Sequence, residues 1–246
     1  SGGDHPSPYR PASRIGSRIR DAASGSVVSE TQKPPAKDTG FMTTQTPQMT
    51  IHTVDQLRET YAEPHELARQ KCVPRLDDHC RRWIALSPFI VLASTDGAGH
   101  VDVSPRGGEP GFVRVADDTT LLLPDLPGNN RLDTLTNILA SPGVGTIFFV
   151  PGFEETLRIN GTAEIVRDEA LRADFADRGR PVSAVLRIAV REVYFHCSKS
   201  LKSSGIWNPE THPDRATFPS LVEVVTDQIC ANAPAADGTA YGAPST

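Results

Sequence analysis

The sequence predicts a mainly β fold, a small barrel of six or seven mostly antiparallel strands with helices at its edges. Short apolar or alternating runs recur between residues 89 and 196, and turn residues separate them at short intervals. The regular alternation of strand and helix that marks a doubly wound parallel sheet is missing. The chain has 246 residues, of which only 38% are hydrophobic, so one packed domain with unpacked extensions is expected.

Composition divides the chain into three parts. Residues 1–48 are rich in Ser, Thr, Gly and Pro and nearly lack large apolar side chains, which predicts a disordered N-terminal tail. Residues 49–212 carry the periodic apolar pattern of the predicted domain. Residues 213–246 are expected to hold one amphipathic helix, over 217–230, followed by a second disordered tail.

Three helices are predicted before the first strand. Thr53 is a suitable N-cap for the first, and Pro64 is expected in the first turn of the second. The third covers 77–86, with Trp83, Ile84 and Leu86 on its apolar side, and Pro88 ends it.

The strands follow in sequence. Residues 89–95 form a continuous apolar run, which predicts burial on both faces. Val101 and Val103 alternate with polar residues as in a half-buried strand, and Pro105 is expected to end that strand. Further strands are predicted over 112–115, 119–123, 143–150, 156–166 and 185–196, and helices over 130–139, 168–175 and 198–203.

Several classes of function lack support. A net charge of −5 gives no electrostatic footprint for nucleic acid, and no apolar run reaches the length of a membrane span. No charged-then-apolar segment opens the chain, so a secretory signal is not expected. The four cysteines form no CxxC and match no common zinc spacing, which favours free thiols and a cytoplasmic location over a metal site. The G-x-S-x-G, H-E-x-x-H, P-loop and G-x-G-x-x-G signatures are all absent.

The stretch 101–132 holds the first candidates for ligand binding. Arg106 follows a strand end, where it can grip an anion or form an ordinary surface ion pair. Asn129, Asn130 and Arg131 precede a predicted helix, so they can cap that helix or form an anion site with its free N–H groups. Together an apolar wall and these polar groups are suited to a phosphorylated ring cofactor.

A second group of candidates follows the last strand. Lys199, Lys202, Ser203 and Trp207 can be a core anchor with a solvated rim, or a lid over a flat aromatic ligand. Arg158, by strand alternation, is expected on an exterior polar face. No general base is assigned, and His100 and His196 are the nearest titratable candidates.

Four stretches resemble one known family. They are LSPFIVLASTDGAGHVDVSPRGGEPGFVRV, LLLPDLPGNNRLDTLTNIL, VGTIFFVPGFEETLRINGTAEI and VYFHCSKSLKSSGIWNP, and they lie in this order within residues 49–212. The segment is similar to the pyridoxamine 5′-phosphate oxidase-like family of FMN-binding split β-barrels, in particular to its bacterial FMN-dependent subgroup.

The resemblance implies a six-stranded antiparallel split β-barrel with N-terminal and C-terminal helices, assembled as a homodimer with one FMN in each of two interface clefts. It places four groups at the cofactor: a strand end that lines the ring and reaches the phosphate, backbone groups at the ring's polar edge, a phosphate-binding turn, and a segment from the other subunit. In this chain they are Ser104, Pro105, Arg106 and Gly107; Leu123, Pro124 and Asp125; Asn129, Asn130 and Arg131; and Lys199, Lys202, Ser203 and Trp207.

Two departures bear on the function. Lys202 stands where the subgroup often carries an arginine, which exchanges a bidentate fork for a single ammonium. Past Trp207 only His212 and Arg215 are available for a substrate phosphate, so pyridoxamine phosphate is not the preferred substrate. The expected function is an FMN-dependent oxidoreductase that exchanges hydride or electrons with a small molecule. The alternatives are a non-catalytic flavin binder (a sensor, store or redox partner) and a split barrel that uses haem or a deazaflavin.

Overall fold

The computed structural model describes residues 50–175 and 181–232. The chain divides into two compact units, Ser1–Leu57 and Arg58–Thr246, and all the structure discussed below from residue 58 onward belongs to the second. The predicted tails, 1–48 and the part beyond residue 232, lie outside the described residues. Within the described ranges, no helix combines the length and the hydropathy that a membrane crossing requires.

Three helices precede the sheet, as predicted. They are α1 (Val54–Thr60), α2 (Glu66–Gln70) and α3 (Asp78–Leu86). The Asp77 carboxylate accepts a hydrogen bond from the Cys80 N–H at 2.8 Å and so caps α3. Two details of the prediction were wrong. The cap of α2 is His65 rather than a turn containing Pro64, and Leu86 is 51% exposed while Cys80 is buried in its place.

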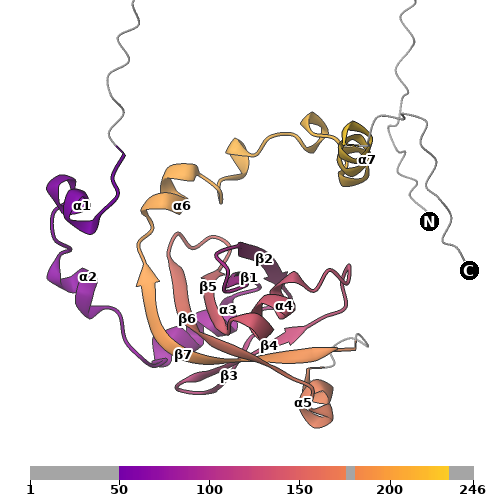
Figure 1. Cartoon of the computed structure of the whole chain (residues 1–246), viewed down its shortest axis with the longest axis horizontal. Coiled ribbons are helices and arrows are strands. Elements are labelled where there is room, and N and C mark those ends of the chain that lie inside the picture. Colours follow the sequence, from indigo (N-terminus) through magenta and orange to yellow (C-terminus); the bar gives the residue numbers. More distant parts are fainter. Residues whose placement is uncertain (1–49, 176–180, 233–246) are drawn as a thin grey trace, which may run out of the picture. The chain divides into compact units, whose positions relative to one another are not determined.

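Among the described residues seven strands form one antiparallel sheet, which agrees with the six or seven predicted from the sequence and is one more than the resemblance implies. The mainly β class with peripheral helices is confirmed. The sheet curves strongly (Figure 1), and its order is β2-β1-β5-β6-β7-β4-β3. The strands are β1 (Phe89–Thr95), β2 (Val101–Gly107), β3 (Arg114–Asp117), β4 (Thr120–Asp125), β5 (Gly143–Phe149), β6 (Thr156–Val166) and β7 (Ala184–His196).

One glycine permits the tightest contact within the sheet. The register between β6 and β7 shifts between Asn160 and Gly161. A Cβ atom at Gly161 would lie 2.0 Å from the carbonyl oxygen of Ala189, so only glycine fits there. Such a bulge bends and twists a strand, which helps to curl the sheet back on itself.

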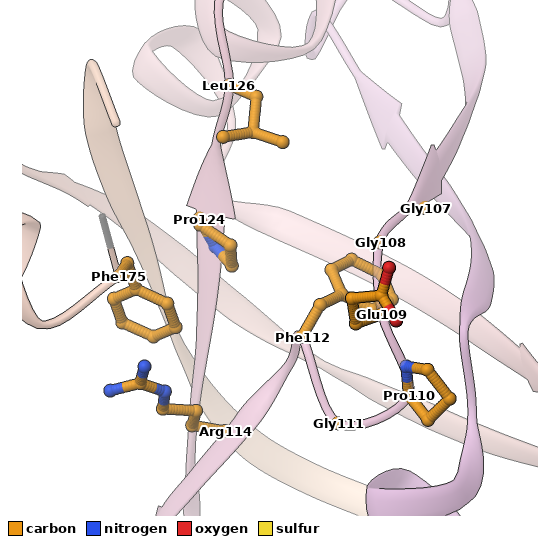
Figure 2. Close-up of a pocket in the computed structure, with 10 residues that line it drawn as sticks. All are labelled: Gly107, Gly108, Glu109, Pro110, Gly111, Phe112, Arg114, Pro124, Leu126 and Phe175. Carbon is orange, nitrogen blue, oxygen red and sulfur yellow. The ribbon is translucent and has the colours of Figure 1, made fainter. Parts of the chain in front are cut away.

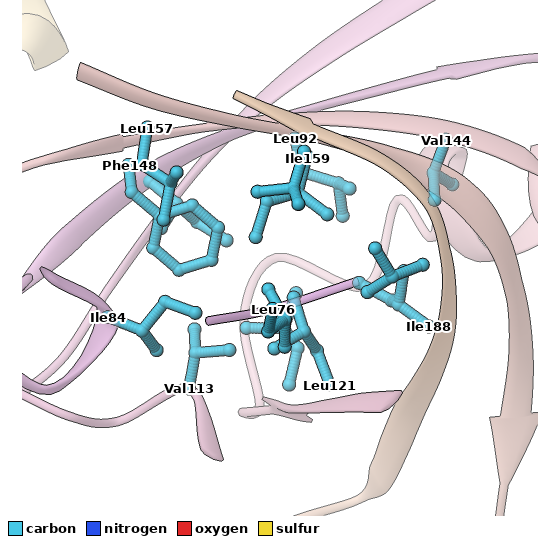
Figure 3. Packing of buried hydrophobic residues seen from close by; sticks show 14 of the residues in the cluster. Leu76, Ile84, Leu92, Val113, Leu121, Val144, Phe148, Leu157, Ile159 and Ile188 are labelled. Carbon is cyan, nitrogen blue, oxygen red and sulfur yellow. The ribbon is translucent and has the colours of Figure 1, made fainter. Parts of the chain in front are cut away.

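The inside of the curved sheet is filled by apolar side chains from most of the strands and from α3. Figure 3 shows Phe148, Leu157 and Ile159 packed against Ile84 and Leu92, all of them buried. Burial of such side chains stabilises each by roughly 1.5–3 kcal/mol relative to exposure. Trp83 closes one end, with its Nε1 donating to the carbonyl of Phe148 at 3.4 Å.

Strand β2 differs from its prediction in two ways. Pro105 does not end it, because β2 is an edge strand that pairs only with β1, where a missing N–H costs no ladder bond. Its valines also face outward: Val101 is 71% and Val103 is 60% exposed, while Asp102, Ser104 and Arg106 lie on the half-buried side. The neighbouring β1 buries one face fully and the other only partly, not both as predicted.

The remaining helices lie after β4. They are α4 (Asp133–Ala140), α5 (Glu169–Asp174), α6 (Lys199–Ser204) and α7 (Leu221–Ala231). Helix α4 packs on β1, β2 and β6, with Ile138 buried, whereas Leu132 and Leu139 of its predicted apolar face are exposed. Ser220 and Glu223 form a complete capping box at the start of α7.

Candidate functional site

The two ends of the curved sheet meet at one ion pair. Arg106 lies on the edge strand β2, Asp125 lies on β4, and the Arg106 Nη1 to Asp125 Oδ1 distance is 2.7 Å. Residues 123–125 have a strand partner only on the side of β7, because β3 pairs with β4 no farther than Leu122. The pair therefore spans the split in the sheet, and its side chains are only 22% and 11% exposed.

A cavity of about 200 Å³, the seam pocket, adjoins this ion pair. Its walls are Arg106, Asp125, the loop 126–130, two leucines of the α4 region and the start of β7. Three of the segments predicted to bind a cofactor thus contribute to one cavity: Arg106 from β2, Asp125 from β4, and Asn129 with Asn130 from the loop.

The loop before α4 has an unusual backbone. Asn130 and Leu132 both have positive φ, of 59° and 61°. The Asn129 Oδ1 accepts a hydrogen bond from the Arg131 N–H at 3.1 Å. The prediction that Asn129 or Asn130 caps the helix was wrong: the N-cap is Leu132, in the left-handed region, and no side chain bonds the first turn. The first N–H groups of α4 are therefore left for other acceptors.

Arg106 keeps binding capacity beyond its ion pair. Its Nε is buried and has no hydrogen-bond partner among the described residues. An unpartnered buried donor of this kind costs free energy, on the order of 1–3 kcal/mol, unless an acceptor fills the position. Asp125 offsets the charge of Arg106, so the attraction of the seam pocket for an anion depends on the free N–H groups around it rather than on a surplus of charge.

Arg131 does not line the seam pocket. Its side chain is 73% exposed, and its Nε donates to the Asp133 Oδ2 at 2.8 Å. This hydrogen bond and the adjacent carboxylate charge raise the pKa of Arg131 further above its usual value. Contact of Arg131 with a phosphate stays a prediction.

A second cavity, the β2–β3 pocket, adjoins the first and shares Leu126 with it. Its volume is about 170 Å³, and Gly107 and Pro124 are the two predicted residues that line it. Figure 2 shows Phe112 facing Pro124 across the cavity, with Phe175 and Arg114 on the far side. The sequence analysis did not select Phe112, Arg114 or Phe175. The one sequence feature that pointed to this cavity was an aromatic residue, Phe112, beside the Gly-rich link 107–111.

Arg114 is held against the ring of Phe175. Its guanidinium carbon lies 4.1 Å from the ring centroid, and its Nη2 donates to the carbonyl oxygen of Asp174 at 2.6 Å. No carboxylate among the described residues forms an ion pair with it. Two weak constraints thus orient the guanidinium and leave most of its five N–H donors open.

The segment after β7 lies at a different cavity. Lys202 and Trp207 line a pocket with Glu154, where Lys202 Nζ is 3.9 Å from Glu154 Oε2. The Trp207 Nε1 donates to the carbonyl of Phe153 at 2.7 Å. Neither Lys199 nor Ser203 lines this pocket, the seam pocket or the β2–β3 pocket, and none of the four predicted residues lines the seam pocket within one chain.

Three other predicted residues have simpler surroundings. Leu123 is a core residue, 1% exposed, so only its backbone is available to a ligand. Ser104 is half-buried and Pro105 is exposed, and neither lines the seam pocket. Arg158 is half-buried rather than fully exterior, with its guanidinium 5.3 Å from the ring of Tyr194.

The described ranges contain histidine, cysteine and carboxylate side chains. No group of three or more His, Cys, Asp or Glu side chains there could hold a metal ion. The four cysteines are free. Burial raises the pKa of the Cys80 thiol to about 11, so it is protonated and unreactive at neutral pH.

Comparison with known proteins places this geometry in a family. Residues 76–197 match the family described as pyridoxamine 5′-phosphate oxidase. That range includes the seam pocket and the β2–β3 pocket but ends before Lys199. No curated protein sequence matches the chain significantly.

Solved structures with a similar fold cover about half of this chain. A variant of HupZ from Group A Streptococcus is 22% identical, with a TM-score of 0.42 over 49% of this chain and 98% of that one. A candidate pyridoxamine 5′-phosphate oxidase from Lactobacillus delbrueckii is 20% identical, with a TM-score of 0.39 over 50% and 99%. An FMN-binding protein from Syntrophomonas wolfei is 11% identical, with a TM-score of 0.40 over 48% and 83%.

Proposed function

Since residues 76–197 belong to the pyridoxamine 5′-phosphate oxidase family, we propose that this protein binds FMN as a homodimer and acts as a flavin-dependent oxidoreductase on a small molecule. The observation that carries the proposal is the seam pocket, where a buried arginine with an unpartnered Nε lies beside a turn that ends in free helix N–H groups. Such groups bind phosphate well.

The phosphate end of the cofactor belongs in the seam pocket. Arg106 offers its Nε, Asn129 and Asn130 offer amides, and the first turn of α4 offers backbone N–H groups. The Asp125 carboxylate holds the Arg106 guanidinium at 2.7 Å, so the orientation of the fork is set before a ligand arrives. A positioned donor loses little conformational entropy on binding, which supports a specific site despite the neutral ion pair.

The ring of the cofactor belongs along the strand ends that flank this pocket. Gly107 on β2 and Pro124 on β4 line the same cavity on the two sides of the split, and the backbone of 123–125 has no strand partner on the side of the split. Ser104 lies on the same strand as Gly107. Unpaired N–H and C=O groups at such an edge can bond the polar edge of a flavin ring. When bound, FMN would supply the hydride or electron transfer, and the chain would orient the ring and exclude water.

Dimer formation is supported by the outward face of β2. Val101 and Val103 expose 71% and 60% of their surface, an arrangement that a strand normally reserves for the buried face. A second copy would cover them. It would also bring Lys199, Lys202, Ser203 and Trp207 toward a site that they cannot reach within their own chain.

The first experiment is the absorption spectrum of the purified protein, with the mass of any ligand released on denaturation. We expect flavin bands in the blue and near ultraviolet and the mass of FMN. If the protein is colourless, FMN is added and its fluorescence followed. A protein that takes up no FMN would refute the cofactor proposal, and a haem or deazaflavin spectrum would identify the alternative directly.

Catalysis needs a separate test. The bound flavin is reduced anaerobically and then mixed with quinones and other acceptors, and the oxidised protein is mixed with nicotinamide donors. We expect turnover with at least one partner at a rate above that of free FMN. Rates no higher than those of free FMN throughout would favour the sensor, store or redox-partner alternative.

The dimer has its own readout. Val103→Glu places a charge on the exposed face of β2 without touching the core, so we expect a monomer by light scattering that still melts cooperatively. The matched control is Val222→Glu on α7, a residue that is 76% exposed, which should leave the mass unchanged. A wild-type protein that is monomeric at all concentrations would contradict the dimer.

A further inference from the structure

We propose that the β2–β3 pocket is a substrate subsite for a planar, single-ring carboxylate, with Arg114 as the residue that binds the carboxylate. The inference rests on the proposed function, because it places the substrate next to the flavin-binding seam. Its core observation is independent of the flavin: a cavity of one-ring size, with two aromatic side chains in its wall, has at its rim a guanidinium that forms no ion pair with the described residues.

Volume limits the ligand to one ring. The cavity holds about 170 Å³. An apolar protein cavity of roughly 150 Å³ accommodates benzene, so this one fits a six-membered ring with one small substituent and excludes a fused ring system. The three-ring flavin is too large for it.

The walls favour a flat apolar ring. Phe112 and Phe175 contribute aromatic surfaces, and Pro124, Pro110 and Leu126 contribute aliphatic ones (Figure 2). Phe175 is 6% exposed and is packed with Val182 and Val185, so its ring is fixed by the core rather than free to fill the cavity. Aromatic ligands gain from offset or edge contacts with such rings beyond the area that they bury.

Charge orients the ligand. Arg114 stacks on Phe175, uses one N–H on the Asp174 carbonyl, and has no carboxylate partner in the described ranges. Its remaining N–H donors can therefore bind a carboxylate, because the two oxygens of a carboxylate match the paired donors of a guanidinium.

Position connects this subsite to the flavin. Leu126 lines both cavities, and Gly107 and Pro124, which we place along the flavin ring, also line the β2–β3 pocket. A ring bound here would lie beside the reactive face of the cofactor, as hydride exchange requires. The substrate class that follows is a monocyclic aromatic or dihydroaromatic acid.

Ligand-observed NMR on the full-length protein, with and without FMN, tests the proposal. Benzoate is the probe, benzamide is the neutral control, and naphthoate is the size control. We expect saturable benzoate binding in both states. Benzamide should bind at least about tenfold more weakly because it lacks the charge-assisted contact, and naphthoate should bind more weakly because its second ring does not fit the cavity. Arg114→Gln should weaken benzoate about tenfold or more. The control Arg187→Gln, which removes an exposed strand arginine paired to Glu164, should not.

The outcomes are separable. Loss of FMN binding with retained benzoate binding would refute the flavin proposal and keep the subsite. Normal FMN binding with no benzoate binding, or benzoate binding that ignores Arg114→Gln, would overturn the subsite. A change in the flavin spectrum on adding benzoate, absent in Arg114→Gln while FMN affinity is unchanged, would support both. Benzoate that competes with FMN would place the flavin itself in this pocket and would also overturn the assignment.

Discussion

Two regions that the sequence assigns to one cofactor site are built very differently. At the split in the sheet, Arg106 on the edge strand β2 and Asp125 on β4, the last strand but one at the other end, form a 2.7 Å ion pair that is mostly shielded from solvent. After β7, Lys202 is 72% exposed and stands 3.9 Å from Glu154 in a loose contact. The first region is fixed by a short, shielded ion pair, and the second is held by an exposed and longer one.

The contrast teaches where pre-organisation comes from. Arg106 and Asp125 lie on strands whose register is set by the core, so their side chains have few alternative conformations. Lys199, Lys202 and Ser203 lie on a six-residue helix with no buried residue, and only Trp207 ties the segment back, through the carbonyl of Phe153. We infer that one subunit supplies the rigid half of the site and that the second subunit supplies the half that adapts.

The largest expected effect comes from breaking the seam. Arg106→Ala leaves Asp125 nearly buried and unpaired, which should destabilise the fold by about 3 kcal/mol and weaken FMN binding by about 1.5–3 kcal/mol. Chemical denaturation and a fluorescence titration measure the two effects. Arg187→Ala, which breaks an exposed pair at 2.6 Å, is the matched control and should cost under about 1 kcal/mol. Equal costs for the two would remove the distinction between the regions.

The double variant separates charge from packing. If Arg106→Met is combined with Asp125→Leu, the buried unpaired charge disappears, and stability should recover by about 2 kcal/mol relative to Arg106→Ala. FMN affinity should stay low, since the guanidinium is gone. Recovery of FMN binding in the double variant would mean that the seam pocket is not the phosphate site.

The pH dependence of the free energy of unfolding tests whether Cys80 stays buried in the core. The unfolded chain releases the Cys80 proton near pH 9.0, whereas the folded chain holds it to about 11, so stability falls as pH rises from 9 to 11. For this thiol, only 3% exposed, the loss is about 2 kcal/mol. Denaturation at pH 8 and 11 should show a smaller loss in Cys80→Ala. The same loss in both proteins would assign it to other groups.

The α6 region should respond more weakly. Trp207→Ala is expected to reduce FMN affinity by about 1 kcal/mol, the size of one aromatic contact, without changing the dimer mass. Fluorescence titration and light scattering measure the two quantities. Conversion to a monomer would instead make Trp207 an anchor of the interface.

The smallest effect is expected at Arg131. Its side chain is 73% exposed and already paired with Asp133, so Arg131→Ala should weaken FMN binding by under about 1 kcal/mol. A loss as large as that of Arg106→Ala would show that Arg131 leaves Asp133 and turns to the ligand on binding.

Most of the element boundaries followed from local patterns. Helix α3 starts one residue after its predicted start, Asp168 caps α5 at the start of the predicted range 168–175, and β6 has the predicted bounds. The wrong predictions concern patterns that are compatible with two different structures. A proline ends a central strand but is tolerated on an edge strand, and Pro105 lies on an edge strand. The valines of β2 point outward because the polar side of this strand faces α4, where Thr134 donates a hydrogen bond to Asp102 at 3.0 Å.

The residues of the candidate site were likewise predicted only in part. Arg106, Asn129 and Asn130 were selected because charged and amide groups at strand and helix ends often bind anions, and the structure gathers them around one cavity with Asp125. Phe112, Arg114 and Phe175 were not selected, because Phe175 lies 61 positions after Arg114 in the chain and no local pattern connects them.

By itself the sequence determined the class of fold, the approximate positions of most helices and strands, the antiparallel pairing and the resemblance to the family, since these depend on periodicity and on residue types within short stretches. Only the tertiary structure decided which ends of the sheet meet, that Arg106 pairs with Asp125, and that the valines of β2 are left outside. These depend on how far a seven-stranded sheet curls, and that curvature comes from packing and from the bulge at Gly161 rather than from any short stretch of chain.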